Sequence, residues 1–131
     1  YMVPLPIEEI RGSENEIIWS NKLNAPKGKR VLSREVADTM NWMLQNVVEK
    51  GTGQAASIKG RQIAGKTGTS EENRDLWFIG SVPQLTIGIW LGNDHYKSTR
   101  GSSADAALIW KKFIESIQED LPITDFPEKG I

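Results

Sequence analysis

The 131-residue sequence contains no cysteine and a single histidine, His95. The lack of cysteine excludes disulfides and cysteine-ligated metal sites, but it does not identify a cellular compartment. One histidine with no second histidine and no cysteine is an insufficient ligand set for a metal. We therefore expect no metal and no cofactor, and we place His95 in an exposed polar loop.

An excess of charge and long hydrophobic runs are also missing. Sixteen basic residues balance seventeen acidic ones, and no block of like charge could serve as a nucleic-acid arm, which argues against nucleic acid as a partner. No apolar run approaches the roughly 20 residues of a membrane-spanning helix, and no signal peptide is present. Because the chain begins with Tyr1, with Met2 after it, we expect a fragment of a longer protein whose targeting segments lie elsewhere.

The apolar content of 38%, including five tryptophans, is sufficient for a hydrophobic core. We expect an α+β fold with an antiparallel sheet of about three to five strands and two main helices. Residues 1–131 are interpreted as a single partial domain. Its expected parts are a hairpin and linker over 1–30, a helix over 33–50, sheet strands within 62–92 and a helix over 103–121.

A periodic apolar stripe predicts the first helix. Ser33 suits its N-cap, and Lys50 followed by Gly51 suits its C-terminal end. The spacing of three and four residues is typical of a helix face buried in a core. We expect burial of the whole stripe, formed by Val36, Ala37, Met40, Met43, Leu44, Val47 and Val48.

Two β-rich runs, Leu76 to Val82 and Leu85 to Gly92, are separated only by Pro83-Gln84 and predict a tight hairpin. The polar loop before them ends at Asp75, which we expect to pair with Arg74 or to cap a turn. In the second run apolar residues alternate with small residues and one tryptophan, so both faces are expected to be covered. The apolar face comprises Leu85, Ile87, Ile89 and Leu91, and the other comprises Thr86, Gly88, Trp90 and Gly92.

The chemically densest stretch is Ile63 to Ser70, which places Lys66, two threonines and a serine among glycines. A cation beside hydroxyls and beside backbone without a Cβ can hold an anionic or carbonyl-bearing ligand. In a regular strand, however, Lys66 and Thr69 face opposite sides. They can share a ligand only if the chain twists at Gly68 or if the site lies along the strand edge.

The tetrad Lys66-Thr67-Gly68-Thr69 is the third signature motif of penicillin-binding proteins and serine β-lactamases. From about Val31 to Ile117 the chain resembles the C-terminal part of the transpeptidase domain of class A penicillin-binding proteins, which implies a partial transpeptidase fold. The resemblance rests on five blocks in the family's order. They are Gly51-Thr52-Gly53, Ala64 to Thr69, Asp75-Leu76-Trp77-Phe78-Ile79-Gly80, Trp90-Leu91-Gly92-Asn93-Asp94, and Trp110.

The resemblance implies two catalytic groups. Lys66 would direct positive charge toward the active-site hydroxyls and the carboxylate of a D-Ala-D-Ala stem peptide, and the Thr69 N–H would be one of two oxyanion donors. The parent protein would be extracytoplasmic and membrane-anchored through a segment absent here. The residues implied to contact the stem peptide or a β-lactam are Thr67, Gly68, Thr69, Ser70 and Trp77.

No Ser-x-x-Lys motif occurs, so the serine that would be acylated lies outside these residues. Ser13-Glu14-Asn15 fits the family's Ser-x-Asn motif, but we interpret it as a hairpin turn. We expect the chain alone to be inactive and to need the N-terminal part of the same domain as its partner. The alternatives are a fragment of a D,D-carboxypeptidase or β-lactamase, and a non-enzymatic module that binds peptidoglycan peptides.

Overall fold

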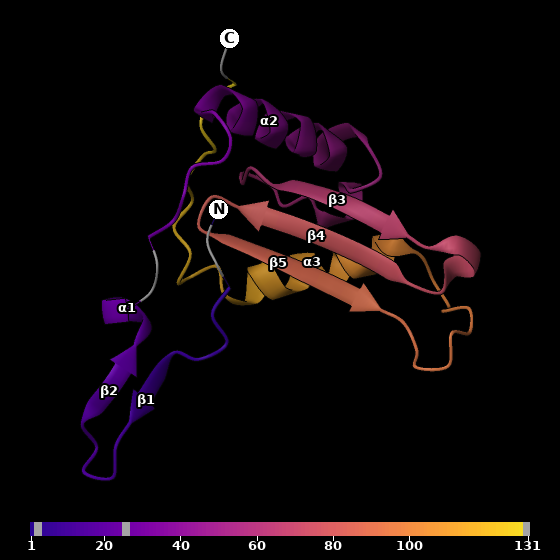
Figure 1. The fold of residues 1–131 in the computed structure, drawn as a ribbon. Coiled ribbons are helices and arrows are strands. Elements are labelled where there is room, and N and C mark those ends of the chain that lie inside the picture. Colours follow the sequence, from indigo (N-terminus) through magenta and orange to yellow (C-terminus); the bar gives the residue numbers. More distant parts are fainter. Residues whose placement is uncertain (2–3, 25–26, 130–131) are drawn as a thin grey trace. The chain divides into compact units, whose positions relative to one another are not determined.

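The computed structural model describes residues 1, 4–24 and 27–129, and the chain forms two compact units, Tyr1–Ser33 and Arg34–Ile131. Antiparallel strands and helices make up the fold (Figure 1), so the predicted α+β class is confirmed. The grouping of all residues into a single partial domain stays a prediction.

The N-terminal unit is built on a hairpin. Strands β1 (Glu9–Arg11) and β2 (Ile17–Ser20) pair antiparallel with a bulge between Ile10 and Arg11, and the short helix α1 (Asn21–Asn24) follows. The Gly12 N–H donates to the Glu16 carbonyl at 2.9 Å, which closes the turn. The predicted hairpin is confirmed.

The larger unit contains a three-stranded antiparallel sheet in the order β3-β4-β5. Its strands are β3 (Ala64–Thr69), β4 (Leu76–Val82) and β5 (Leu85–Leu91). Pro83-Gln84 joins β4 to β5, as the sequence predicts. Two short 3₁₀ segments flank β3, η1 (Gln54–Ala56) before it and η2 (Glu71–Asn73) after it.

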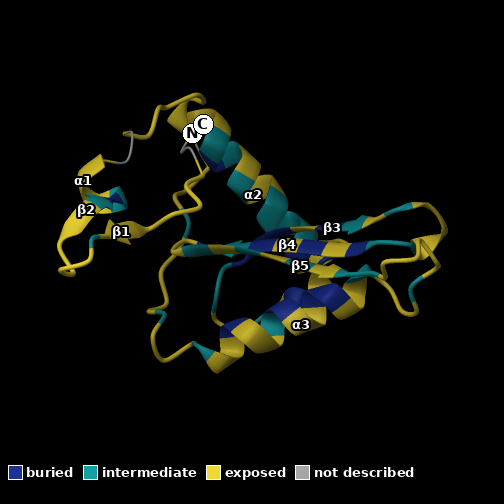
Figure 2. Ribbon diagram, turned by 60° about the horizontal axis from the view of Figure 1, so that its bottom comes forward, coloured by how far each residue is buried: buried dark blue, intermediate teal, exposed yellow. Residues whose placement is uncertain are grey.

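Helix α3 (Ser103–Ser116) covers one face of this sheet (Figure 2). Ser102 caps it, because its hydroxyl accepts from the Ala104 N–H at 3.3 Å and the Asp105 carboxylate accepts from the Ser102 N–H at 2.7 Å. The helix ends before the expected residue 121, since the chain continues there in separate turns. The buried core includes Val48, Ala56, Ile63, Phe78, Val82, Ala106, Ala107, Trp110 and Ile114.

Trp110 explains the spacing of the aromatic block in β4. Its ring meets Phe78 edge-on at 5.6 Å, and its indole N–H donates to the Gly80 carbonyl at 3.2 Å. A Cβ on Gly80 would lie 2.6 Å from both the Phe78 and the Trp110 rings. A glycine is therefore required where α3 approaches β4.

Helix α2 (Arg34–Lys50) forms where expected, but its stripe is only partly buried. Val48 is buried, whereas Val36, Met40 and Met43 are between 50% and 52% exposed and Asp38 is buried. The expectation that the whole stripe enters the core is wrong. Periodicity identifies an apolar face, but the element that covers it is set by tertiary packing, and α2 turns only part of its stripe, including Val48, toward the core.

The second face of the sheet is open. Trp77, Ile79 and Trp90 are between 41% and 51% exposed, and Thr86 and Gly88 are exposed as well. Only the Leu85 face of β5 packs against the core. The expectation that both faces are covered is wrong for the described residues, because α3 packs on the larger apolar face.

Candidate functional site

Strand β3 lies at the edge of the three-stranded sheet, and within the part of the chain that the structure describes it pairs with β4 alone. The Ser70 N–H donates to the Asp75 carbonyl at 3.0 Å, so these two residues form a hydrogen-bonded pair. Bonding alternates along an antiparallel ladder, and the β3–β4 register has no shift. The N–H and C=O groups of Gly65, Thr67 and Thr69 therefore point away from β4, toward the free edge of β3.

Lys66 reaches the same edge. Its side chain is exposed, and its Nζ donates to the carbonyl oxygen of Thr67 at 2.8 Å. The Lys66 ammonium and the Thr69 N–H can thus meet one ligand along the strand edge, although the side chains of Lys66 and Thr69 alternate across the sheet. This is the edge arrangement that the sequence leaves as one of two possibilities.

Thr67 points into the protein. It is buried, and its hydroxyl shares a 2.6 Å hydrogen bond with the hydroxyl of Thr52. Thr52 follows α2, and the sequence alone assigns it no role of its own. Its place between Gly51 and Gly53 in a block of the resemblance was the signal that could have identified it.

Gly68 and Trp77 lie on the face of the sheet that carries Lys66. They are opposite each other in the β3–β4 register, and a Cβ on Gly68 would lie 3.3 Å from the Trp77 Cβ. The rings of Trp77 and Trp90 are 6.3 Å apart and tilted by 42°. The structure therefore brings Lys66, Gly68 and Trp77 onto one open face.

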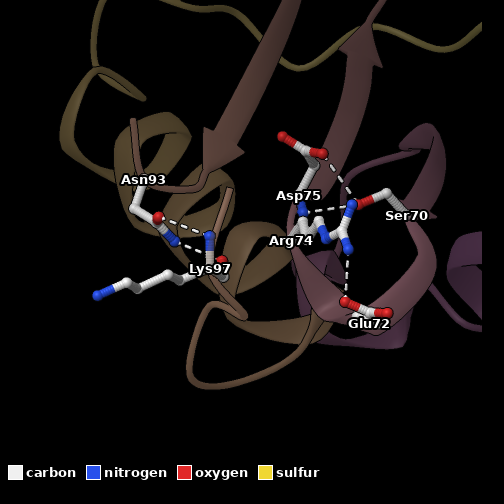
Figure 3. A network of polar contacts seen from close by, with 6 residues as sticks. All are labelled: Ser70, Glu72, Arg74, Asp75, Asn93 and Lys97. Carbon is white, nitrogen blue, oxygen red and sulfur yellow. Dashed lines mark hydrogen bonds and ion pairs between the residues drawn. The ribbon is translucent and has the colours of Figure 1, made fainter. Parts of the chain in front are cut away.

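Ser70 directly follows β3 and is hydrogen-bonded to Asp75 (Figure 3). Its hydroxyl donates to Asp75 Oδ2 at 2.9 Å and accepts from the Asp75 N–H at 2.8 Å. Asp75 Oδ1 accepts from the Trp90 indole N–H at 2.9 Å. The Trp90 bond, followed by the Ser70 bond and the charge of Arg74, lowers the pKa of Asp75 below its ordinary value. The expected turn-capping role of Asp75 is observed, whereas Arg74 pairs with Glu72 instead.

The remaining sequence candidates belong to other elements of the chain than strand β3. Ser13-Glu14-Asn15 forms the exposed turn of the β1–β2 hairpin, where Asn15 adopts a φ of 65°. His95 is in an exposed loop, and its backbone N–H donates to Asn93 Oδ1 at 3.3 Å. Across residues 4–24 and 27–129, no group of three His, Cys, Asp or Glu side chains could hold a metal ion. No helix in these ranges is long and apolar enough to cross a bilayer.

Comparison with known proteins gives consistent matches. The family model described as "Penicillin binding protein transpeptidase domain" matches residues 1–115. Penicillin-binding protein 1A of Clostridium botulinum is 38% identical over 96 residues, which cover 72% of this chain and 12% of that protein. Penicillin-binding protein 1A of Aquifex aeolicus is 32% identical over 126 residues, which cover 94% of this chain and 17% of that protein. The chain thus spans between 12% and 17% of the length of these two relatives.

Two solved structures share the fold. The D,D-transpeptidase domain of a peptidoglycan glycosyltransferase from Eggerthella lenta matches with a TM-score of 0.66 and 24% identity, over 87% of this chain and 27% of that one. The imipenem acyl-enzyme complex of penicillin-binding protein A from M. tuberculosis matches with a TM-score of 0.61 and 26% identity. The match covers 82% of this chain and 25% of that one.

Proposed function

Because the chain belongs to the transpeptidase domain family of the penicillin-binding proteins, we propose that it supplies one wall of the active site of a peptidoglycan cross-linking D,D-transpeptidase. In such an acyl transfer, a serine attacks the carbonyl carbon between two D-alanines, the terminal D-alanine leaves, and an amine takes the acyl group. The chain has no Ser-x-x-Lys, so the serine comes from the parent protein. We use "parent protein" for the longer polypeptide that would carry both parts.

One observation carries the proposal, namely that the Lys66 ammonium and the Thr69 N–H both lie along the free edge of β3. The Thr69 N–H is one of two donors to the oxyanion that forms when the serine attacks. A preorganised donor of this kind is typically worth about 3 kcal/mol of barrier. Lys66 supplies positive charge to the serine and to the terminal carboxylate of the stem peptide.

The other wall residues have more limited roles in this proposal. The exposed Thr69 hydroxyl bonds the carboxylate, and Gly68 lets the ligand approach beside Trp77. Thr67 contributes its backbone, since its hydroxyl is bonded to Thr52. Ser70 borders the ligand while its own hydroxyl is held by Asp75.

The partner of this wall is the remaining part of the same transpeptidase domain. The face with Trp77, Ile79 and Trp90 is apolar and open, and exposed apolar surface of this kind is typical of an interface. A β-lactam would bind the wall as a mimic of the D-Ala-D-Ala stem peptide. The parent protein would act on the extracytoplasmic side of the membrane, where peptidoglycan is assembled.

Product analysis of the parent protein tests this function. A pentapeptide ending in D-Ala-D-Ala is expected to release one D-alanine and, with an amine acceptor present, to yield the peptide joined to that acceptor, both reactions being blocked by penicillin. Hydrolysis without transfer would identify a D,D-carboxypeptidase. Binding of the peptide without release of D-alanine would identify a non-enzymatic binding module, and either result would contradict the proposal.

A further inference from the structure

The C-terminal end of β3 is held by one carboxylate. Asp75 accepts a hydrogen bond from the Ser70 hydroxyl on one oxygen and from the Trp90 indole N–H on the other. Two further bonds join the same residues, since the Ser70 N–H donates to the Asp75 carbonyl and the Asp75 N–H donates to the Ser70 hydroxyl oxygen. Ser70 and Asp75 thereby close a hydrogen-bonded ring around the turn between them. The side chain of Asp75 thus joins the end of β3 to β5, across β4.

The turn inside this ring has an unfavourable backbone. Glu72 and Asn73 adopt φ values of 58° and 54°, a left-handed conformation that non-glycine residues rarely take. Such a conformation persists only where its surroundings fix it. Thr99 fixes one side, since its N–H donates to the Asn73 carbonyl at 2.8 Å and its hydroxyl to the Arg74 carbonyl at 2.9 Å. Asp75 fixes the other side, next to β3 (Figure 3).

Thr69 directly precedes Ser70 in the chain, so a displacement of Ser70 also shifts the backbone of Thr69, including its N–H. We propose that Asp75 is a positioning residue, which holds the Thr69 N–H in place for the oxyanion by anchoring Ser70 and Trp90 together. This role rests on the proposed function, because it assumes that Thr69 serves acyl transfer. Asp75 itself touches no reacting atom, and it acts only through Ser70.

The test is the time course of acylation of the parent protein by a fluorescent penicillin, which separates three quantities. They are the dissociation constant of the non-covalent complex, the acylation rate constant, and the fraction of protein finally labelled. Because a misplacement of 1 Å can cost about 10²-fold in rate, Asp75→Ala is expected to slow acylation about tenfold. The dissociation constant should change less than about twofold, and labelling should remain complete.

Four further variants extend this test. Ser70→Ala removes one hydroxyl and should slow the same step, and the Asp75→Ala/Ser70→Ala double variant should be no slower than the slower single variant, since both act through one contact. Trp90→Phe removes the indole N–H that donates to Asp75 while keeping an aromatic ring, and it should have a smaller effect in the same direction. Glu71→Ala is the matched control, because it removes an exposed carboxylate from the same turn and should acylate at the wild-type rate.

A purely structural role predicts a different result, in which the labelled fraction falls while the molecules that react do so at the wild-type rate. That result, or additive losses in the double variant, would overturn the positioning role. If the Asp75→Ala variant does not fold, the acylation rate constant and the labelled fraction of the Ser70→Ala variant decide between the two roles. Failure of wild-type protein to acylate would overturn the proposed function and this role together, whereas acylation that needs Lys66 but not Asp75 would overturn this role only.

Discussion

Replacing Lys66 by alanine in the parent protein is expected to abolish acylation by penicillin and to leave the fold intact. Lys66 is exposed, and its one hydrogen bond within the described residues goes to the Thr67 carbonyl, so its removal opens no cavity. Loss of the positive charge at the strand edge should lower the acylation rate by about 10³-fold or more, as for other preorganised electrostatic groups. The second-order rate constant for labelling by a fluorescent penicillin measures this loss.

Lys59→Ala provides the control for charge. Lys59 is also exposed and lies in the turn before β3. Each variant loses one lysine, so Lys59→Ala has the same net charge as Lys66→Ala. It should acylate at nearly the wild-type rate, and the two variants should melt at similar temperatures. A folded Lys66→Ala variant with a near-normal acylation rate would show that the role assigned to Lys66 is wrong.

The second large effect concerns stability. Phe78→Ala in the 131-residue chain is expected to lower the free energy of unfolding by about 3–5 kcal/mol, because it removes a fully buried ring and leaves a cavity beside Trp110. Domains of this size have a total stability of only about 5–15 kcal/mol, so the variant should be close to unfolding. Chemical denaturation followed by tryptophan fluorescence measures the difference.

Trp77→Ala is the matched control, since Trp77 precedes Phe78 in β4 but lies on the open face and is 41% exposed. Although it removes a larger side chain, it should cost about 1 kcal/mol in the isolated chain, a typical value for a point substitution. If both variants lost the same stability, the assignment of one closed and one open face to the sheet would be contradicted.

Local patterns were sufficient for most of the elements. The two β-rich runs and the Pro83-Gln84 turn between them predict the β4–β5 hairpin, and the helix expected from residue 103 begins there, as α3. Each of these signals depends on residues a few positions apart, which is why the sequence alone shows them.

The burial of the helix and sheet faces could not be predicted in the same way. The stripe of α2 is apolar, yet Met40 and Met43 are about half exposed, because periodicity does not specify the element that covers a face. The expectation that the Trp90 and Gly88 face of β5 is covered is wrong for the same reason. Such faces are settled by contacts between elements that are distant in sequence.

In the candidate site, too, the sequence predicts local features, whereas contacts between distant residues appear only in the structure. The tetrad predicts Lys66 and Thr69 as site residues, but which of their groups face the free edge depends on which side of β3 pairs with β4. The Thr52–Thr67 bond and the Asp75–Trp90 bond each join residues fifteen positions apart, and no local spacing predicts them. The supporting contacts of the wall therefore came from the structure alone.

The location of a penicillin adduct tests the central claim most directly. The 131-residue chain and the parent protein are each treated with penicillin, and their intact masses are measured by mass spectrometry. Each is then digested, and the modified residue is located by peptide mapping. We predict one adduct on the parent protein, at a serine outside these 131 residues, and none on the chain alone. A stoichiometric covalent adduct on the chain itself, at Ser70 or Ser13, would contradict the account and would make that serine the nucleophile.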